Sequence, residues 1–431
     1  MTARPASLRI AATLLMAGPA CAQTMPDAGQ TAVAPVRPVG ATLINARAIA
    51  PFLTKLPQAR TSTPPLSIVQ IGDSHTAGDM FTNGWRKRWQ AEYGSGGRGM
   101  SAVGRPYQGY LTWGVTARQS PEWVTNALFG KARVADGPLL GLSGFTTSAQ
   151  HAGAWLQLRA DGPGFTFDQF SLCGLTGPDK GTVRIAMTPA SPGAVETARD
   201  TSFAAEVPGA TCVNLAAPAP ANAVSITTLD DRPVNLTSWS STRQIGGVIV
   251  SNLGVVGARL GHFTRNDDQV LALELRQARP DLLAVAFGTN EGFDPSLKLD
   301  EAEAVIRTQI DRLRRLLGHD VPIMLIGPPD AASSRPEVAL PGMAETVNCG
   351  GGWYIPGNLA RVRQLQIRLA QTLHLAFWDW QSAMGGPCSS MRWVAQGLQR
   401  GDHVHFTVDG GRLLGDSLAA DLDQAGANLA P

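Results

Sequence analysis

Residues 67–75 read Ser-Ile-Val-Gln-Ile-Gly-Asp-Ser-His, an apolar run that ends in a Gly and a group of polar side chains. A short run of this kind is typical of a strand that is buried on both faces. Further runs of the same type lie at 247–252, 282–287, 322–326 and 375–379. Helical periodicity occupies 78–93, 258–278, 299–317, 357–373 and 408–424. Strands that alternate with helices predict an α/β fold, in which helices cover both faces of a parallel sheet.

The segment 114–243 has a different pattern. Its apolar residues alternate or are β-branched in short runs, and Gly, Pro and Asp separate these runs. Examples lie at 154–158, 165–167, 182–187 and 223–227. Short strands at this spacing predict a β-sandwich. We therefore expect one α/β domain made of residues 63–113 and 244–431, with a β-sandwich domain inserted at 114–243.

The first residues have the form of a secretory signal. Arg4 and Arg9 precede a short apolar run, and Ala20-Cys21-Ala22 fits the small-x-small pattern of a signal-peptidase site. We predict that residues 1–22 are a signal peptide cleaved near Ala22, which places the mature chain in the periplasm or outside the cell. Lipidation at Cys21 is the alternative.

The rest of the chain contains no run of about 18 apolar residues, so we predict no transmembrane segment. Residues 23–62 are rich in Ala, Pro and Thr, and we predict that they form a linker with one short helix near 44–56. The chain has 36 Lys and Arg against 34 Asp and Glu, a net charge of +2. This balance argues against a nucleic-acid partner, which requires a concentrated basic excess.

Four cysteines remain after the predicted cleavage, namely Cys173, Cys212, Cys349 and Cys388. An even number of cysteines in an exported chain predicts disulfides. Three pairings are possible, and proximity in the sequence favours Cys173–Cys212 and Cys349–Cys388. Free buried thiols are the alternative. The spacing matches neither a zinc site nor a redox pair, and we predict no metal.

Polar segments lie where the predicted strands end. They are Gly-Asp-Ser-His at 72–75, Asn-Leu-Gly-Val-Val-Gly at 252–257 and Gly-Thr-Asn-Glu at 288–291, and Asp-His-Val-His at 402–405 precedes the last helix. In an open α/β sheet, ligand sites collect at the carboxyl ends of the strands. We therefore expect all of these segments to meet in one crevice.

The side chains in these segments are suited to nucleophilic catalysis. Ser74 is the candidate nucleophile, which requires a base to remove its proton. His405 is the candidate base, and Asp402 is expected to hold its imidazole in the required tautomer. A tetrahedral oxyanion requires fixed donors. The backbone N–H groups of Ser74 and Gly257 and the amide of Asn290 are the candidates.

In this order, these segments resemble the four blocks of the SGNH (GDSL-like) hydrolase family. The resemblance implies a three-layer α/β/α flavodoxin-like sheet and ester hydrolysis without a cofactor. By matched position it assigns the triad to Ser74, Asp402 and His405, and the oxyanion hole to Ser74, Gly257 and Asn290.

Residues 72–79, 252–259, 377–380, 384–388 and 402–407 are similar to segments of periplasmic peptidoglycan O-acetylesterases within that family. Those enzymes also carry an inserted β-sandwich that resembles a carbohydrate-binding module. They remove acetyl from the C6 hydroxyl of N-acetylmuramic acid. The resemblance therefore implies an acetylated glycan as substrate, either peptidoglycan or an exopolysaccharide.

Other residues have weaker signals. His75, beside the nucleophile, and Trp353, in a Gly-rich loop after the fourth strand, are candidates for the substrate rim, with structural roles as the alternative. Asp79 and Glu291 have the positions of loop or helix-cap groups. The Gly-Ser-Gly-Gly-Arg-Gly run at 94–99 follows a helix instead of a strand, which argues against a dinucleotide site and favours a flexible rim near the crevice.

Three functions fit this sequence. The first is an exported esterase that removes O-acetyl groups from a polysaccharide such as peptidoglycan. The second is an acetyltransferase, or an esterase acting on an exopolysaccharide such as cellulose, because the same acyl-serine can pass acetyl to water or to a sugar. The third is a glycan-binding module in which the insert is the functional part. The intact set of catalytic residues argues against the third.

Overall fold

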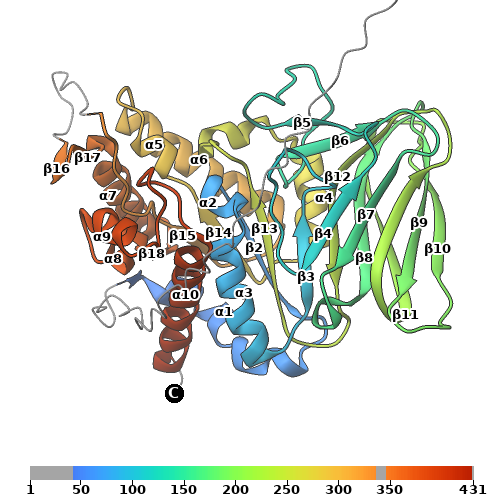
Figure 1. The fold of residues 1–431 in the computed structure, drawn as a ribbon, viewed down its shortest axis with the longest axis horizontal. Helices are drawn as coiled ribbons and strands as arrows, with labels where there is room; N and C mark the ends of the chain where they lie inside the picture. Colours follow the sequence, from blue (N-terminus) through green and yellow to red (C-terminus); the bar gives the residue numbers. More distant parts are fainter. Residues whose placement is uncertain (1–41, 336–345, 430–431) are drawn as a thin grey trace, which may run out of the picture. The chain divides into compact units, whose positions relative to one another are not determined.

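The computed structural model describes residues 42–335 and 346–429, and a six-stranded sheet forms the centre of its α/β part (Figure 1). The strand order is β1-β18-β15-β14-β2-β13. The strands are β1 (Leu43–Ile44), β2 (Leu66–Gly72), β13 (Val248–Gly254), β14 (Leu282–Ala286), β15 (Ile323–Ile326) and β18 (Ala376–Trp378). All neighbours are parallel except β1, which pairs antiparallel with β18. The five predicted strands are confirmed within two residues at each end.

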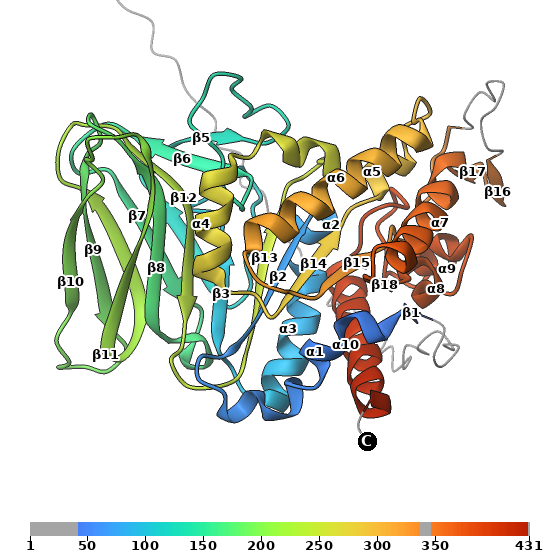
Figure 2. The same cartoon turned by 180° about the vertical axis from the view of Figure 1, so that it is seen from behind.

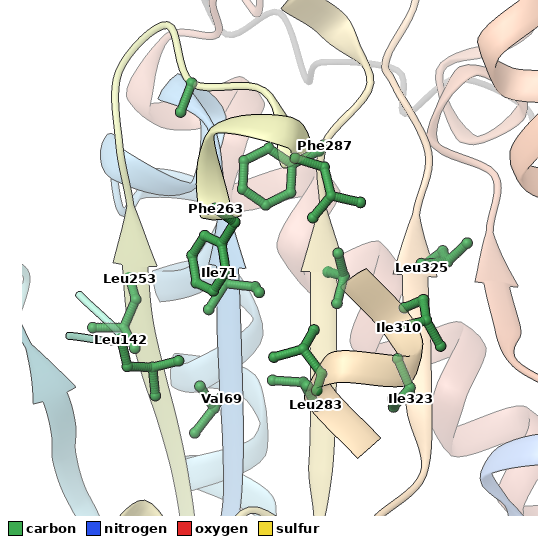
Figure 3. Packing of buried hydrophobic residues seen from close by; sticks show 14 of the residues in the cluster. Val69, Ile71, Leu142, Leu253, Phe263, Leu283, Phe287, Ile310, Ile323 and Leu325 are labelled. Atoms are coloured by element: carbon green, nitrogen blue, oxygen red, sulfur yellow. The ribbon is translucent and has the colours of Figure 1, made fainter. Parts of the chain in front are cut away.

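Helices pack on both faces of this sheet, because successive strand residues point to opposite sides. On one face, Val69 and Leu283 lie in a core with α4 (Asp268–Ala278), α6 (Leu299–Leu317) and α7 (Gly357–Thr372). Figure 3 shows Val69 and Ile71 of β2 beside Leu283 of β14 in this core.

On the other face, Ile68 and Leu282 pack against α1 (Ala50–Leu53), α3 (Met80–Tyr93) and α10 (Val408–Leu429). Helices α3 and α10 lie side by side (Figure 1). The mixed α/β class is confirmed.

Three predicted helices differ from the structure by two or more residues. The last one, predicted at 408–424, extends to Leu429 as α10. The run predicted at 258–278 is a 3-10 helix at Leu260–Arg265 followed by α4, because Asp267 caps α4 by accepting the N–H groups of Gln269 and Val270. The run predicted at 78–93 starts two residues later, as α3, and the short helix α2 (Ser74–Ala77) precedes it.

The predicted linker is wrong for residues 42–61. Residues 42–61 are folded: β1 adds an edge strand to the sheet, and Phe52 and Leu53 are buried in the same core as α3 and α10. The predicted short helix is present as η1 (Ala46–Ile49) and α1. Ile49, Leu56 and Ala59 of this segment are buried in the same core, and the Ala- and Pro-rich composition concealed this. The predicted signal peptide, its Cys21 and residues 23–41 lie outside the described residues.

The β-rich part is a ten-stranded sheet in which all pairs of strands are antiparallel (Figure 2). Its strands are β3 (Gly97–Ser101), β4 (Val115–Gln119), β5 (Val124–Ala127), β6 (Phe145–Ala149), β7 (Trp155–Ala160), β8 (Phe167–Thr176), β9 (Thr182–Pro189), β10 (Thr197–Ser202), β11 (Gly209–Thr228) and β12 (Val234–Thr242). The predicted runs at 154–158, 182–187 and 223–227 lie in these strands. The run at 165–167 covers the end of a 3-10 helix at Pro163–Phe165 and the start of β8.

Strand β3 corrects a second prediction. The Gly-rich run at 94–99 is not a flexible rim, because its second half forms β3, which is buried throughout and pairs with β12. Gly97 leaves no room for a Cβ, which would lie 2.5 Å from the Thr242 Cα. The glycines therefore allow close strand contact.

Both predicted disulfides are present. Cys173–Cys212 joins β8 to β11, and Cys349–Cys388 joins β16 (Val347–Gly350) to the start of α9 (Ser389–Ala395). Such cross-links are typical of chains that fold in an oxidising compartment. Within the described ranges, none of the helices combines the length and the apolar character needed to cross a membrane.

Candidate active site

The register of the central sheet brings the polar segments to one edge. Gly72, the last residue of β2, lies opposite Gly254 of β13 on one side and Ala286 of β14 on the other. The segments that follow these three residues therefore start at the same level of the sheet. This is the arrangement that the sequence predicted.

Ser74 lies at the first turn after β2. Asp73 caps the short helix α2, and its Oδ1 accepts the N–H of His75 at 2.9 Å. Gly72 is required before it, since a Cβ at this position would lie 2.6 Å from the carbonyl oxygen of Ala286. The tight turn thus presents the Ser74 hydroxyl at the end of the sheet.

Ser74, His405 and Asp402 are connected by hydrogen bonds. The Ser74 Oγ lies 3.1 Å from the His405 Nε2, and the His405 Nδ1 lies 2.9 Å from the Asp402 Oδ2. The other carboxylate oxygen of Asp402 accepts the backbone N–H groups of Val404 and His405, both at 2.9 Å. The loop itself therefore fixes the carboxylate, which in turn orients the imidazole.

The electrostatics of Asp402 suit this role. Partial burial opposes its charge, but the hydrogen bonds from the His405 and Val404 N–H groups outweigh burial, so the pKa of Asp402 is lowered. The side chains of His405 and Asp402 remain 39% and 48% exposed. Solvent therefore has access to the His405 imidazole.

The predicted oxyanion donors lie on the neighbouring segments. Gly257 has φ of 74°, a conformation that glycine adopts without strain, in the turn that follows β13. The Asn290 Nδ2 donates to the carbonyl oxygen of Ala258 at 2.9 Å, which ties α5 (Thr289–Gly292) to this turn. In the part of the chain that the structure describes, the N–H groups of Ser74 and Gly257 donate to no protein acceptor.

His75 does not lie on a substrate rim. Its side chain is buried, the Nδ1 lies 3.2 Å from the Asp73 Oδ1, and the Nε2 lies 3.0 Å from the carbonyl oxygen of Val404. Burial opposes the charge on the ring, but Asp73 outweighs burial, and the pKa of His75 is raised. Both ring nitrogens are occupied, so His75 holds the loop that carries His405 instead of contacting substrate.

Trp353 lies beside the same loop. It starts β17 (Trp353–Ile355), which forms a hairpin with β16, and the Cys349–Cys388 disulfide ties this hairpin down. The Trp353 ring is 3.8 Å from the ring of His403, centroid to centroid. One face of the half-buried indole is therefore covered by the 402–405 loop, and the place of Trp353 on the substrate rim stays a prediction.

His403 and His405 lie in one loop, but their rings have different partners. The His403 Nδ1 lies 3.2 Å from the Ser390 Oγ, whereas the His405 ring faces Ser74 and Asp402. Over residues 42–335 and 346–429, no group of three His, Cys, Asp or Glu side chains is arranged to hold a metal ion.

Asp79 forms an ion-pair centre that the sequence did not indicate. It is fully buried, its carboxylate pairs with Arg86 at 2.8 Å and with Arg98 at 3.0 Å, and it accepts the backbone N–H of Trp113 at 2.9 Å. Asp79 therefore joins α3, β3 and the loop before β4. The only signal in the sequence was an arginine between glycines, which we interpreted as a loop.

Glu291 lies next to Asn290 and supports the same region. Its Oε1 accepts the N–H of Leu260 at 2.9 Å, while its Oε2 is buried without a partner among the described residues. Burial raises the pKa of Glu291 to about 7, although the Leu260 N–H opposes this. The carboxyl group thus links α5 to the segment that follows Gly257.

No protein-family model and no curated protein sequence matches the chain. Among solved structures, a peptidoglycan O-acetylesterase is 26% identical, with a TM-score of 0.70, and the match covers 90% of this chain and 99% of that chain. A family two carbohydrate esterase from Clostridium thermocellum, in complex with cellohexaose, is 10% identical, with a TM-score of 0.27 over 70% of this chain and 98% of that chain. A family two carbohydrate esterase from Cellvibrio japonicus is 12% identical, with a TM-score of 0.26 over 73% and 99%.

The last two structures are too distant to bear on the function of this chain. The first likeness extends over almost the whole of both chains and confirms the resemblance that the sequence blocks predicted. On this likeness the chain is a carboxylic-ester hydrolase, similar to peptidoglycan O-acetylesterases of the SGNH type.

Proposed function

We propose that this chain is an exported serine esterase that removes O-acetyl groups from a polysaccharide, with peptidoglycan acetylated at C6 of N-acetylmuramic acid as its substrate. The observation that carries the proposal is the hydrogen-bonded series from Ser74 through His405 to Asp402 at the end of the sheet. The likeness to a peptidoglycan O-acetylesterase supports the choice of glycan.

The first half of the reaction forms an acyl-enzyme. The Ser74 Oγ attacks the acetyl carbonyl carbon and passes its proton to the His405 Nε2, 3.1 Å away. The Asp402 carboxylate stabilises the imidazolium that results. The imidazolium then gives the proton to the departing sugar oxygen, and acetyl remains on Ser74.

The oxyanion that forms in each half requires donors that are already in place. The N–H groups of Ser74 and Gly257 are free of protein partners in the described structure, and one N–H of Asn290 is free beside the N–H that holds Ala258. In the second half, His405 takes a proton from water, the hydroxide attacks the acetyl carbon, and the imidazolium returns the proton to the Ser74 Oγ as acetate leaves.

Solvent access favours hydrolysis over transfer to a sugar. The fate of the acyl-serine depends on whether water or a sugar hydroxyl reaches it. The side chains of His405 and Asp402 are 39% and 48% exposed, so water reaches the base directly. An acetyltransferase would be expected to shield this position.

The proposal includes the organisation of the chain. We assign residues 42–113 and 244–431 to a three-layer flavodoxin-like catalytic domain, and 114–243 to an inserted β-sandwich that resembles a carbohydrate-binding module. Strand β3 lies in the first range and pairs with β12 of the insert. Helices on both faces of the parallel sheet and a separate apolar core in the β-rich part support this assignment. The two disulfides support export to the periplasm or beyond.

The test is the Ser74→Ala variant. Its hydrolysis of p-nitrophenyl acetate and its release of acetate from O-acetylated peptidoglycan are compared with those of the wild type and of Ser191→Ala, which alters an exposed turn serine. We expect Ser74→Ala to lose activity on both substrates and Ser191→Ala to keep it. Wild-type turnover in Ser74→Ala would overturn the mechanism, and acetate release from xylan or cellulose acetate but not from peptidoglycan would overturn the substrate.

A further inference from the structure

A loop of the β-rich part reaches the oxyanion segment of the α/β part. Phe129, in the loop that joins β5 to β6 (Figure 1), stacks on His262, with ring centroids 4.4 Å apart and planes 11° from parallel. The same ring lies against Gly257, where a Cβ would be 2.9 Å from the Phe129 Cε1. A residue outside the four catalytic blocks therefore contacts a candidate oxyanion donor.

The backbone holds this loop in place. Arg265 donates from Nη1 to the carbonyl oxygen of Leu128 at 2.9 Å, and the Leu128 N–H donates to the carbonyl oxygen of Gly144 at 2.8 Å. Leu128 is fully buried, whereas the adjacent Phe129 is 36% exposed. One face of the Phe129 ring is covered by His262, so its exposed surface is free for a ligand.

The surroundings of the Phe129 ring are basic. Burial and the charges of Arg265, Arg259 and Arg133 lower the pKa of His262 to about 4. Arg259 pairs with Asp294 at 2.6 Å, while the exposed Arg133 has no side-chain partner in the described structure. An excess of positive charge therefore lies beside an exposed aromatic ring. We call Phe129, His262, Arg133, Arg259 and Arg265 the Phe129 shelf.

We propose that the Phe129 shelf is a substrate subsite that selects peptidoglycan by its charge. Phe129 packs against a sugar ring of the glycan strand, and the Arg133 side chain binds a carboxylate of the peptides attached to that strand. This inference rests on the proposed esterase function and names the substrate class: an acetylated glycan that carries anionic peptides.

Position and chemistry both support this assignment. Because Phe129 touches Gly257, a sugar whose acetyl carbonyl accepts from the Gly257 N–H has its ring beside Phe129. Apolar faces of pyranose rings pack on aromatic rings, and guanidinium groups bind carboxylates with charge-assisted hydrogen bonds. Neutral acetylated glycans such as xylan offer no group for Arg133.

The experiment compares two substrates for each variant. O-acetylated peptidoglycan contacts the shelf, whereas p-nitrophenyl acetate carries no sugar and no carboxylate. For Phe129→Ala and Arg133→Gln, we expect the ratio of kcat/KM on peptidoglycan to kcat/KM on p-nitrophenyl acetate to fall about 10-fold, mostly through KM. Phe129→Tyr should restore the ratio, and Arg199→Gln, on the exposed strand β10, should leave it unchanged.

Two further measurements test how the shelf recognises its substrate. The first tests whether Arg133 acts through its charge, and the second tests whether the carboxylates must belong to peptides or can belong to the sugar. Raising the salt concentration should weaken peptidoglycan hydrolysis more in the wild type than in Arg133→Gln, because salt screens exposed charges. O-acetylated alginate, whose carboxylates belong to the sugar, should be a poorer substrate than peptidoglycan.

The outcomes that overturn the inference are distinct from failure of the proposed function. A ratio that stays constant in both Phe129→Ala and Arg133→Gln would show that the shelf does not contact the glycan. Equal activity on alginate and peptidoglycan would overturn the selection for peptides. A wild-type protein that cleaves none of these esters would instead overturn the esterase function.

Discussion

The imidazole rings of His75 and His405 lie nearly parallel, with their centroids 5.6 Å apart and their planes 28° from each other. Each histidine has its own carboxylate partner, Asp73 for His75 and Asp402 for His405. The two pairs differ in exposure, because the His75 pair is buried and the His405 pair is open to solvent.

The hydrogen-bond partners of His75 require two protons on its ring. The Nε2 faces a carbonyl oxygen, which only accepts, and the Nδ1 faces the carboxylate of Asp73. Asp73 is buried, and in the described part of the chain its ion pair is with His75. A buried carboxylate needs a compensating cation, so we assign the imidazolium form to His75.

The first prediction concerns His75→Gln, which keeps a donor for Val404 but has no charge. We expect it to lower the free energy of unfolding by about 3 kcal/mol in weakly acidic solution. The pKa of His75 is raised above 6.5 in the fold, so its contribution is complete below 6.5 and is lost as the pH rises through the raised value. Urea unfolding at several pH values measures this.

In His75→Gln, the difference in stability from the wild type should therefore shrink toward alkaline pH. His151→Gln, which alters an exposed histidine of the β-rich part, is the matched control and should show no such trend. A His75→Gln deficit that does not change with pH would contradict the assignment of the charge.

The second prediction concerns Asp402→Asn. The asparagine oxygen can still accept the backbone N–H groups of Val404 and His405, but an amide cannot stabilise the imidazolium. We expect kcat on p-nitrophenyl acetate to fall about 10²- to 10⁴-fold with little change in KM. Asp300→Asn, in the exposed first turn of α6, should retain activity. Equal kcat values for the two variants would rule out a catalytic role for Asp402.

The third prediction concerns Gly257→Ala. Its φ of 74° disfavours a side chain, and the new Cβ would lie 2.9 Å from the Phe129 ring. Either effect displaces the Gly257 N–H, so we expect kcat to fall about 10- to 100-fold on every ester. Gly261→Ala is the control, since a Cβ there meets nothing closer than 3.7 Å. A similar kcat for both variants would argue against Gly257 as a donor.

Much of the α/β part was predictable from local patterns. Strands buried on both faces read as apolar runs, and the polar residues at their ends fall together once the sheet is parallel. Ser74, Asp402 and His405 are predicted from these polar residues and from the resemblance to SGNH hydrolases. Ser74, Gly257 and Asn290 follow β2, β13 and β14, and the register of these strands brings their ends to the same level.

The features that the sequence concealed depend on contacts between distant segments. Strand β3 pairs with β12 about 140 residues further on, and its glycines carry no periodicity. Arg98 appeared to be a loop residue because its partner, Asp79, lies 19 positions earlier in another element. Phe129 contacts Gly257 across the boundary between two predicted domains. No local pattern contains such information.

The last prediction concerns Glu291→Gln. Burial raises the pKa of Glu291 to about 7 from 4.5, so the folded protein binds more protons than the unfolded chain between these values, and its stability falls as the pH rises through them. Glutamine keeps an acceptor for the Leu260 N–H without this cost. We therefore expect Glu291→Gln to gain about 1–2 kcal/mol over the wild type above neutral pH, and nothing below pH 4.5, in urea unfolding. Glu196→Gln, in an exposed turn, should show no gain at any pH. A loss of stability at alkaline pH in Glu291→Gln would mean that the charged carboxylate itself holds α5 against Leu260.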